Sequence, residues 1–326
     1  MPRGQPASSQ QPLTQKTITL TFALGPQPEN TPSAPLNSPR TFPGTNADTV
    51  TILGLRCSAN ITIAGGISLG ALQLTAYGMT PDQMNTLSTL GMKVIIVPRS
   101  TVTVQAGNAG SALTQVYQGG IIQAYTDYSG MPEVAFRVEA AAGYYTKVGP
   151  APPLSTQTTA VATIMASLAQ QAGVAAGIPG GYPLHNFGVT ATASPQYLWG
   201  SYWDQMGALA KAYRFNLQIN HQNSPNTIDI WPIGASKQGN QQIPLISPDT
   251  GMVGYPSFTA QGIIVRTQFN PALSFGTQVQ VESSIPQANK TYYIAKLGHT
   301  LDAMVPNGSW FTDLALYELG YQVVTQ

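Results

Sequence analysis

The segment Gly66-Ile67-Ser68-Leu69-Gly70 has the G-x-S-x-G pattern that presents the nucleophile in many serine hydrolases. In those enzymes the serine stands on a sharp turn between a strand and a helix, and an acidic residue and a histidine complete the triad. Ser68, then Asp229 or Asp249, then His299 follow one another in the chain order that such hydrolases often use. The first question is therefore whether a helix follows the serine.

The residues after Gly70 predict a strand rather than a helix. Leu72, Leu74 and Ala76 recur with a period of two and alternate with polar or aromatic residues. Glycines between two strands permit positive φ angles, so a turn is the simpler interpretation of this segment. We interpret Ser68 as a turn residue and predict no catalytic residue, with a serine hydrolase that uses Ser68 as the alternative.

The other residue types that carry chemistry are sparse. His185, His221 and His299 show no metal-ligand spacing, and Cys57 is the only cysteine, which excludes a disulfide framework and a multi-cysteine metal site. No phosphate-binding or dinucleotide-binding glycine motif is present, and the 13 acidic residues are dispersed. We therefore expect no metal or cofactor site, structural histidines, and a protein that is not an enzyme.

The four tryptophans raise a further alternative, a secreted β protein that binds carbohydrate through exposed rings. Trp199 and Trp203 would both have to be exposed in such a protein. The stretch "SPQYLWGSYWDQMGALAKAYR" instead predicts an amphipathic helix with Ser194 as its cap. Packing in a core or an interface is therefore the favoured role of both rings.

Composition indicates a subunit that buries much of its surface. Only 8% of the 326 residues are charged, against about a quarter in ordinary soluble proteins. The net charge of +1 provides no basic field for nucleic acid. We find neither a signal peptide nor an apolar run of about 18 residues, so membrane insertion is not expected.

Period and proline content divide the chain into four parts. Residues 1–15 are polar and predict a flexible tail, and residues 16–150 predict a strand-rich domain with a proline-rich loop at 25–48. Residues 151–240 predict a small α+β domain. Residues 241–326 return to strands and loosely echo the stretch from 101 to 142, which hints at a second domain of the same kind.

Capping and turn residues predict the short elements. Thr80 caps a helix that ends at Gly91, and a second helix ends at Gly173. The stretches "FNLQINHQ" and "NTIDIWPI" predict a hairpin with "NSPN" around its turn, and "MKVIIVP" predicts a further strand.

Three stretches resemble the baseplate hub proteins of contractile-tailed bacteriophages, a family related to the hub part of type VI secretion spikes. They are "SLGALQLTAYGMTPDQMNTLSTLG", "VTVQAGNAGSALTQVYQGGIIQAY", and "DTGMVGYPSFTAQGIIVRTQFNPALSFGTQVQV" with its continuation "YYIAKLGHTLDAMVPNGSWFTDL". Their order and spacing carry the resemblance, which covers most of residues 50–318.

The resemblance implies an α+β, β-rich fold in which two tube-forming, β-barrel-like domains flank the small α+β domain. It implies a structural homotrimer that presents six barrels to the hexameric tail tube and docks the central spike protein at its other end. The tail tube protein and other baseplate proteins would be its partners, and the genome would pass through the lumen without specific binding. The expected location is the tail baseplate of the virion, after assembly in the host cytoplasm.

Within such a ring the second and third stretches would form the tube wall through strand contacts between subunits. Asn270, Pro271 and Gly276 would shape a turn at one rim.

Overall fold

The computed structural model describes residues 14–26, 40–64, 68–89, 99–237 and 242–318. Most of the predicted flexible tail, the middle of the proline-rich loop and the predicted strand "MKVIIVP" lie outside these residues. Within the described ranges, no helix combines the length and the apolar character that a membrane span requires.

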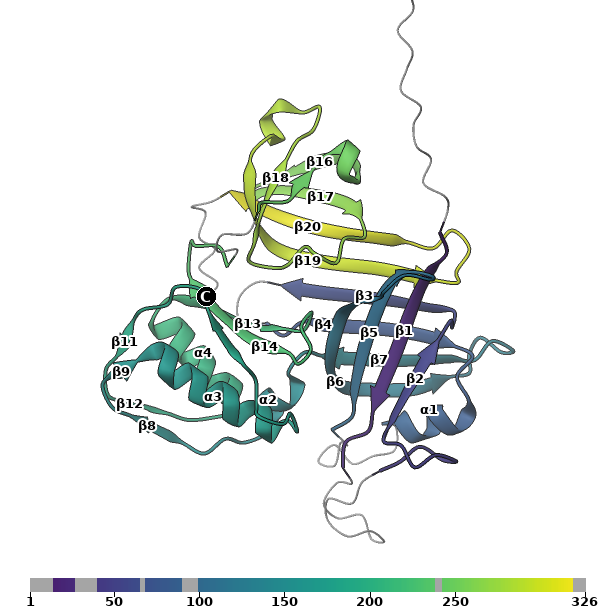
Figure 1. Ribbon diagram of the computed structural model, residues 1–326, viewed down its shortest axis with the longest axis horizontal. Coiled ribbons are helices and arrows are strands. Elements are labelled where there is room, and N and C mark those ends of the chain that lie inside the picture. The colour runs from purple at the N-terminus through teal and green to yellow at the C-terminus, as the bar shows by residue number, and fades with distance from the viewer. Residues whose placement is uncertain (1–13, 27–39, 65–67, 90–98, 238–241, 319–326) are drawn as a thin grey trace, which may run out of the picture.

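One 13-stranded sheet runs through most of the described chain (Figure 1). Its strands follow the order β16-β17-β20-β19-β3-β4-β7-β6-β5-β1-β2, with β18 and then β15 attached beside β19. The N-terminal strands are β1 (Lys16–Ala23), β2 (Thr49–Leu53), β3 (Cys57–Ala64), β4 (Ala71–Tyr77), β5 (Thr101–Asn108), β6 (Thr114–Asp127) and β7 (Ala135–Ala141). The C-terminal strands are β15 (Leu245–Ile246), β16 (Met252–Thr259), β17 (Gly262–Gln268), β18 (Gln278–Val281), β19 (Thr291–Ala303) and β20 (Trp310–Glu318). The predicted β-rich character of the fold is confirmed.

The strand order of this sheet occurs twice. In the N-terminal half the neighbours are β3-β4-β7-β6-β5, and in the C-terminal half they are β16-β17-β20-β19-β18. Numbered along the chain, each half has its strands in the order one, two, five, four, three. The irregularities also match, because an extra residue interrupts the ladder between Ile121 and Gln123 in β6 and between Ile294 and Lys296 in β19. The weak echo in the sequence therefore corresponds to a repeated topology.

Strand β19 joins the two halves. Its first residues pair with β18, whereas residues 296–303 pair antiparallel with the whole of β3. The alternating burial of β3 follows from its alternating apolar residues, which face the core beneath the sheet. A second apolar core fills the C-terminal half and includes Trp231, Tyr292 and Leu297.

The remaining part packs helices on a small sheet. Helices α3 (Val161–Ala175) and α4 (Tyr202–Ala212) lie beside β10 (Leu184–Asn186), β14 (Thr227–Pro232) and β13 (Phe215–Asn220), in that sheet order. The hairpin predicted around "NSPN" is confirmed as β13 and β14. The other elements are α2 (Tyr144–Val148), β8 (Leu154–Thr156), β9 (Thr159–Ala160), β11 (Thr192–Ala193), β12 (Gln196–Leu198), η1 (Pro248–Thr250) and η2 (Pro286–Ala288).

Helix α1 (Pro81–Leu87) begins as predicted and ends early. The Thr80 side chain accepts a hydrogen bond from the backbone N–H of Gln83 in a capping box. The helix ends at Leu87 instead of Gly91, because the backbone N–H of Thr89 donates to the carbonyl oxygen of Ala124 at 2.8 Å. This bond draws the chain onto β6 before another helical turn can form.

Two further helix ends were predicted wrongly. Helix α3 continues through Gly173 to Ala175, because Gly173 serves a close approach: a Cβ there would collide with the backbone of Tyr182. Helix α4 begins after Ser201 rather than Ser194, since Ser201 forms a capping box with Asp204. Between these two serines, Gln196–Leu198 instead form β12.

Candidate functional site

Ser68 lies exposed in the connection between β3 and β4, and the strand predicted after it is β4. His299 is buried within β19, where its Nδ1 lies 2.9 Å from Thr312 Oγ1, and Asp249 is exposed in η1. Among the described residues, no two of Ser68, Asp229, Asp249 and His299 share a hydrogen bond or ion pair. The chain order of a triad is present without the geometry of one.

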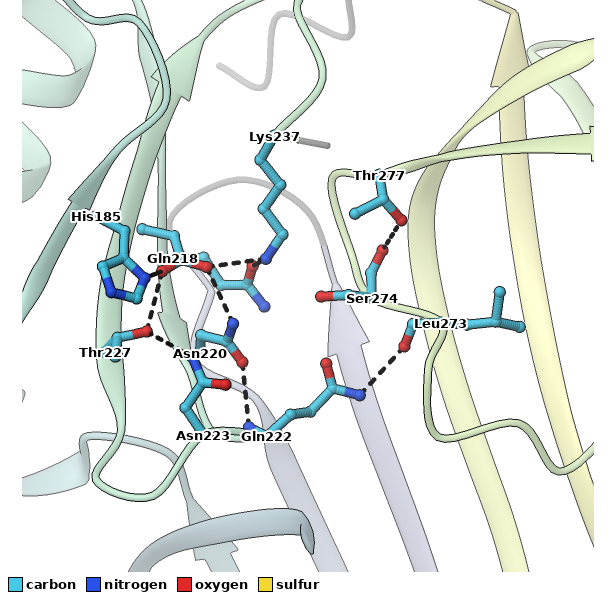
Figure 2. Close-up of polar contacts among 11 residues, drawn as sticks. His185, Gln218, Asn220, Gln222, Asn223, Thr227, Lys237, Leu273, Ser274 and Thr277 are labelled. Carbon is cyan, nitrogen blue, oxygen red and sulfur yellow. Dashed lines mark hydrogen bonds and ion pairs between the residues drawn. The ribbon is translucent and has the colours of Figure 1, made fainter. Parts of the chain in front are cut away.

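A cluster of buried polar side chains surrounds Asp229 on β14 (Figure 2). The Lys237 ammonium lies 3.0 Å from Asp229 Oδ2 and donates to Gln218 Oε1 at 2.8 Å. The Asn220 amide donates to the same carboxylate oxygen at 3.0 Å, and the Thr227 hydroxyl donates to Oδ1 at 3.0 Å. The carboxylate therefore has one charged partner and two neutral donors, and the half-exposed His185 ring lies 3.4 Å from its Oδ1.

Both members of this ion pair are buried, so the loss of either one would be costly in stability. Lys237 is 6% exposed and Asp229 is 1% exposed. Loss of hydration lowers the pKa of Lys237, and the neighbouring Asp229 carboxylate opposes that shift. A buried charge is tolerated when it is paired and hydrogen-bonded, so each member of the pair depends on the other.

The turn between β13 and β14 connects this cluster to two other segments. Gln222 Nε2 donates to the carbonyl oxygen of Leu273 at 3.1 Å, in the connection between β17 and β18. Gln115 of β6 donates through Nε2 to the carbonyl oxygens of His221 at 3.0 Å and of Asn223 at 2.7 Å. The hairpin turn is thus bonded to both halves of the large sheet.

A cavity of about 340 Å³ lies beside the ion pair, lined partly by Lys237, Asn220, Gln222, Ser274 and Thr277 (Figure 2). These groups are amides, hydroxyls and one compensated ion pair, a set suited to hydrogen bonding between chain segments. In the part of the chain that the structure describes, no group of three or more His, Cys, Asp or Glu residues is placed to hold a metal ion. The polar cluster around Asp229, together with the bonds of Gln222 and Gln115, can fix the β13–β14 hairpin, β6 and the connection between β17 and β18 relative to one another. We call this cluster and these bonds the junction.

The three histidines occupy different environments. His185 lies on β10 with its side chain about half exposed and its Nδ1 3.4 Å from Asp229 Oδ1. His221 is fully buried against the ring of Tyr117, at 4.9 Å between ring centroids, and burial lowers its pKa to about 4. Burial likewise lowers the pKa of His299 to about 3. His299 lies within β19, where Thr312 of β20 and Ile61 of β3 are its partners on the two neighbouring strands.

The predicted place of Trp199 in the amphipathic helix is wrong, whereas its packing in an interface stays a prediction. Trp203 is buried in α4, whereas Trp199 precedes the helix and is 75% exposed, close in the chain to the exposed Tyr197. The cap at Ser201 shifts the start of the helix and leaves Trp199 outside it. Trp199 and Trp203 therefore do not form the exposed pair that a carbohydrate platform requires.

Sequence reasoning missed the junction itself. Asp229 lies within β14 and Lys237 in the loop that follows this strand, and no spacing rule connects them. The signal that was available is the rarity of charge: a lysine and an aspartate in a chain with 8% charged residues, both beside apolar strands, are candidates for a buried pair.

Comparisons with known proteins find one family model that matches part of the chain. Residues 233–304 match the family model described as baseplate hub gp41. No curated protein sequence matches the chain. The matched segment contains Lys237, the connection between β17 and β18, and all of β19.

Solved structures extend the likeness along the chain. The 43 kDa tail protein of prophage MuSo2 from Shewanella oneidensis has a TM-score of 0.57 and 11% identity, over 93% of this chain and 97% of that chain. The tail protein from Neisseria meningitidis MC58 has a TM-score of 0.59 and 9% identity, over 94% and 98%. The E. coli c3393 protein, a type VI secretion component similar in structure to T4 tail proteins gp27 and gp5, has a TM-score of 0.56 and 10% identity, over 87% and 78%.

At these identities the solved structures show a shared fold, and the family model adds a sequence match. The predicted resemblance to baseplate hub proteins is therefore confirmed by sequence over residues 233–304. The fold of the two tail proteins is shared over more than nine tenths of the chain.

Proposed function

We propose that this chain is a structural subunit of a phage tail baseplate hub, and that three copies form a ring between the hexameric tail tube and the central spike. The repeated strand order carries the proposal. Each chain holds two five-strand units of one topology, so a ring of three chains presents six such units. This number matches a sixfold tube with threefold symmetry of the ring itself.

In this proposal residues 16–150 and 241–326 are the two tube-forming, barrel-like domains, and residues 151–240 form the α+β domain between them. Residues 1–15 and 25–48 would contact neighbouring baseplate proteins. The junction has a mechanical role, because its bonds hold the α+β domain to both units of the same chain. A ring that transmits force needs its domains in fixed orientation.

Scarce charge supports an assembled subunit with a neutral channel. A chain with 8% charged residues and a net charge of +1 lacks the repulsion that keeps soluble monomers apart. It also lacks a basic surface that would retain nucleic acid. Genome passage without specific binding, in the baseplate of a virion assembled in the host cytoplasm, is consistent with both properties.

The native mass of the purified chain, measured over a concentration series with images of the same particles, tests the proposal. We expect a trimer with a central channel that binds the end of purified tail tubes. A monomer at every concentration, with no binding to tubes, would refute it. Incubation with a fluorophosphonate probe tests the enzyme alternative: we expect no labelling, whereas labelling abolished by Ser68→Ala would support a hydrolase.

A further inference from the structure

Strand β16 leaves one end of the large sheet open. Among the described strands it pairs only with β17, and it carries no charged residue. Val253, Tyr255 and Phe258 are 38%, 74% and 57% exposed. Edge strands that remain in solvent are normally protected by charges, prolines or bulges. Pro256 and the bulge between Val253 and Ser257 protect the first part of β16, whereas residues 257–259 pair regularly with β17 and have no such protection. This uncharged last part, with the exposed Phe258, indicates a stretch that another chain covers.

Within the chain, the strand that corresponds to β16 in the other half is β3, and its edge is covered by β19. Strand β3 is the first strand of the N-terminal repeat, as β16 is of the C-terminal repeat. Residues 296–303 of β19, the fourth strand of the C-terminal repeat, cover β3 with an antiparallel ladder. The fourth strand of the N-terminal repeat is β6, which is therefore the counterpart of β19.

Strand β6 has a free side at the corresponding place. Its first part pairs with β5 as far as Gly120, and residues 125–127 pair with β7 alone among the described strands. Tyr128 and Met131, which follow, are 58% and 71% exposed. Exposed apolar side chains thus lie on the open edge of β16 and in the segment that follows the open part of β6. Figure 1 places β16 and β6 on opposite sides of the β19–β3 contact.

We propose that β16 of one copy pairs antiparallel with residues 125–127 of β6 in the next copy, in the register of the β19–β3 contact. This inference rests on the proposed trimeric hub. The matching ladder irregularities align Ile121 with Ile294, and hence Thr126 with His299. His299 lies opposite Ile61, whose counterpart in β16 is Phe258.

The register places Phe258 opposite Thr126, Thr259 opposite Tyr125, and Ser257 opposite Asp127. Asp127 already has a partner, since Arg137 Nε donates to its carboxylate at 2.7 Å, so no unpaired charge enters the contact. The ladder cannot extend beyond the pair of Thr259 and Tyr125, because the backbone groups of the next residue, Ala124, are already hydrogen-bonded to Thr89. Repeated head to tail, a contact between two different edges closes a ring when its rotation permits.

Paired cysteines test the register. Residues directly opposite in an antiparallel ladder have Cα atoms about 4.5–5.5 Å apart, within the range of a disulfide. The native Cys57 is fully buried, so introduced thiols dominate the reaction. We expect oxidation of the Thr126→Cys/Phe258→Cys variant to convert the monomer band to linked dimer and trimer on a non-reducing gel.

The matched control is Leu53→Cys/Phe258→Cys, because Leu53 is exposed on β2 at the other end of the sheet. We expect this pair, and each single variant, to leave the monomer band. Cross-linking through Leu53 instead of Thr126 would overturn the proposed partner strand. A native trimer without cross-links at Thr126 would overturn the pairing and leave the hub proposal intact, whereas a monomer at every concentration would overturn both.

A charge on the edge provides a second readout. The Phe258→Lys variant should lose the trimer and keep the melting temperature of the isolated subunit, because the side chain is exposed. Phe258→Leu should retain the trimer. A Phe258→Lys protein that remains trimeric would contradict the contact.

Discussion

Replacing Lys237 with methionine tests whether the junction depends on its buried ion pair. Methionine keeps an unbranched side chain and removes the ammonium that lies 3.0 Å from Asp229 Oδ2. The carboxylate would keep the Thr227 and Asn220 donors but lose its charged partner while it stays buried. Removing one member of a buried pair costs about 3–5 kcal/mol. We expect the free energy of unfolding to fall by about this amount in denaturant titrations.

Two controls separate the ion pair from general damage. Lys290→Met removes an exposed lysine that lies 2.7 Å from Glu318, and surface pairs are worth at most about 1 kcal/mol. The double variant Lys237→Met/Asp229→Asn leaves no buried charge, so its loss of stability should be smaller than the sum of the two single losses. The double-mutant cycle then gives the coupling between the two side chains.

Two results would refute this reasoning. The first is a Lys237→Met protein that loses no more stability than Lys290→Met. The second is a double variant whose loss equals the sum of the single losses, because additivity means that the two groups do not interact. Either result would mean that the neutral hydrogen bonds of the junction, such as that from Gln222 to Leu273, stabilise it rather than the ion pair.

Burial lowers the pKa of His221 from 6.5 to about 4, and that of His299 to about 3. The folded protein then binds fewer protons than the unfolded chain, so the free energy of unfolding should fall as the pH drops from about 6.5 to about 4, by about 3 kcal/mol for His221 alone. Denaturant titrations at pH 7 and pH 4 measure this loss, and equal values would contradict it. Gly276 has a φ of +85°, and a Cβ there would lie 2.7 Å from Trp231 Cζ2. Gly276→Val should therefore cost more than the roughly 1–2 kcal/mol of a left-handed residue and abolish the trimer. Gly110→Val, at φ +79° with open space around it, should incur only the backbone cost; a stable Gly276→Val trimer would disprove the requirement.

The strands were predictable because each needs only a local alternation of apolar residues. Leu72, Leu74 and Ala76 of β4 are buried as their period indicated. Helix boundaries were harder to predict from the sequence, since they depend on competition between local signals and distant contacts. Ser194 and Ser201 both precede suitable sequences, and only the side-chain bond to Asp204 decides between them.

The junction was not predictable, because its partners come from segments whose contact only the complete fold creates. The Gln115 side chain on β6 reaches the turn after β13, more than 100 residues later in the chain. Nothing in the local sequence distinguishes this glutamine from the many exposed ones. Long-range polar contacts follow from topology, whereas burial of an apolar face follows from the sequence pattern itself.

The repeat also explains why the two halves can differ in function. Their ladders require the same alternation, and Val102 and Val104 of β5 correspond to Val279 and Val281 of β18. The connections between the second and third strands carry no such requirement. The N-terminal half has α1 there, packed on β6, while the C-terminal half has residues 269–277, which bond to the junction.

Both connections contact the α+β part, but in different ways. In the N-terminal half, the Arg99 side chain donates to the carbonyl oxygen of Ala175 at the end of α3. Among the described residues, it is the C-terminal connection that bonds to the junction. The backbone N–H of Lys237 donates to the carbonyl oxygen of Gly276 at 2.9 Å, and the counterpart connection in the N-terminal half is occupied by α1. In the proposed ring the strands alternate with approximate sixfold symmetry, while the α+β parts recur only three times. Three copies of one chain can thus present six similar strand units to a hexameric tube and a threefold surface to the central spike, because the two units of each chain share their ladders and differ in their connections.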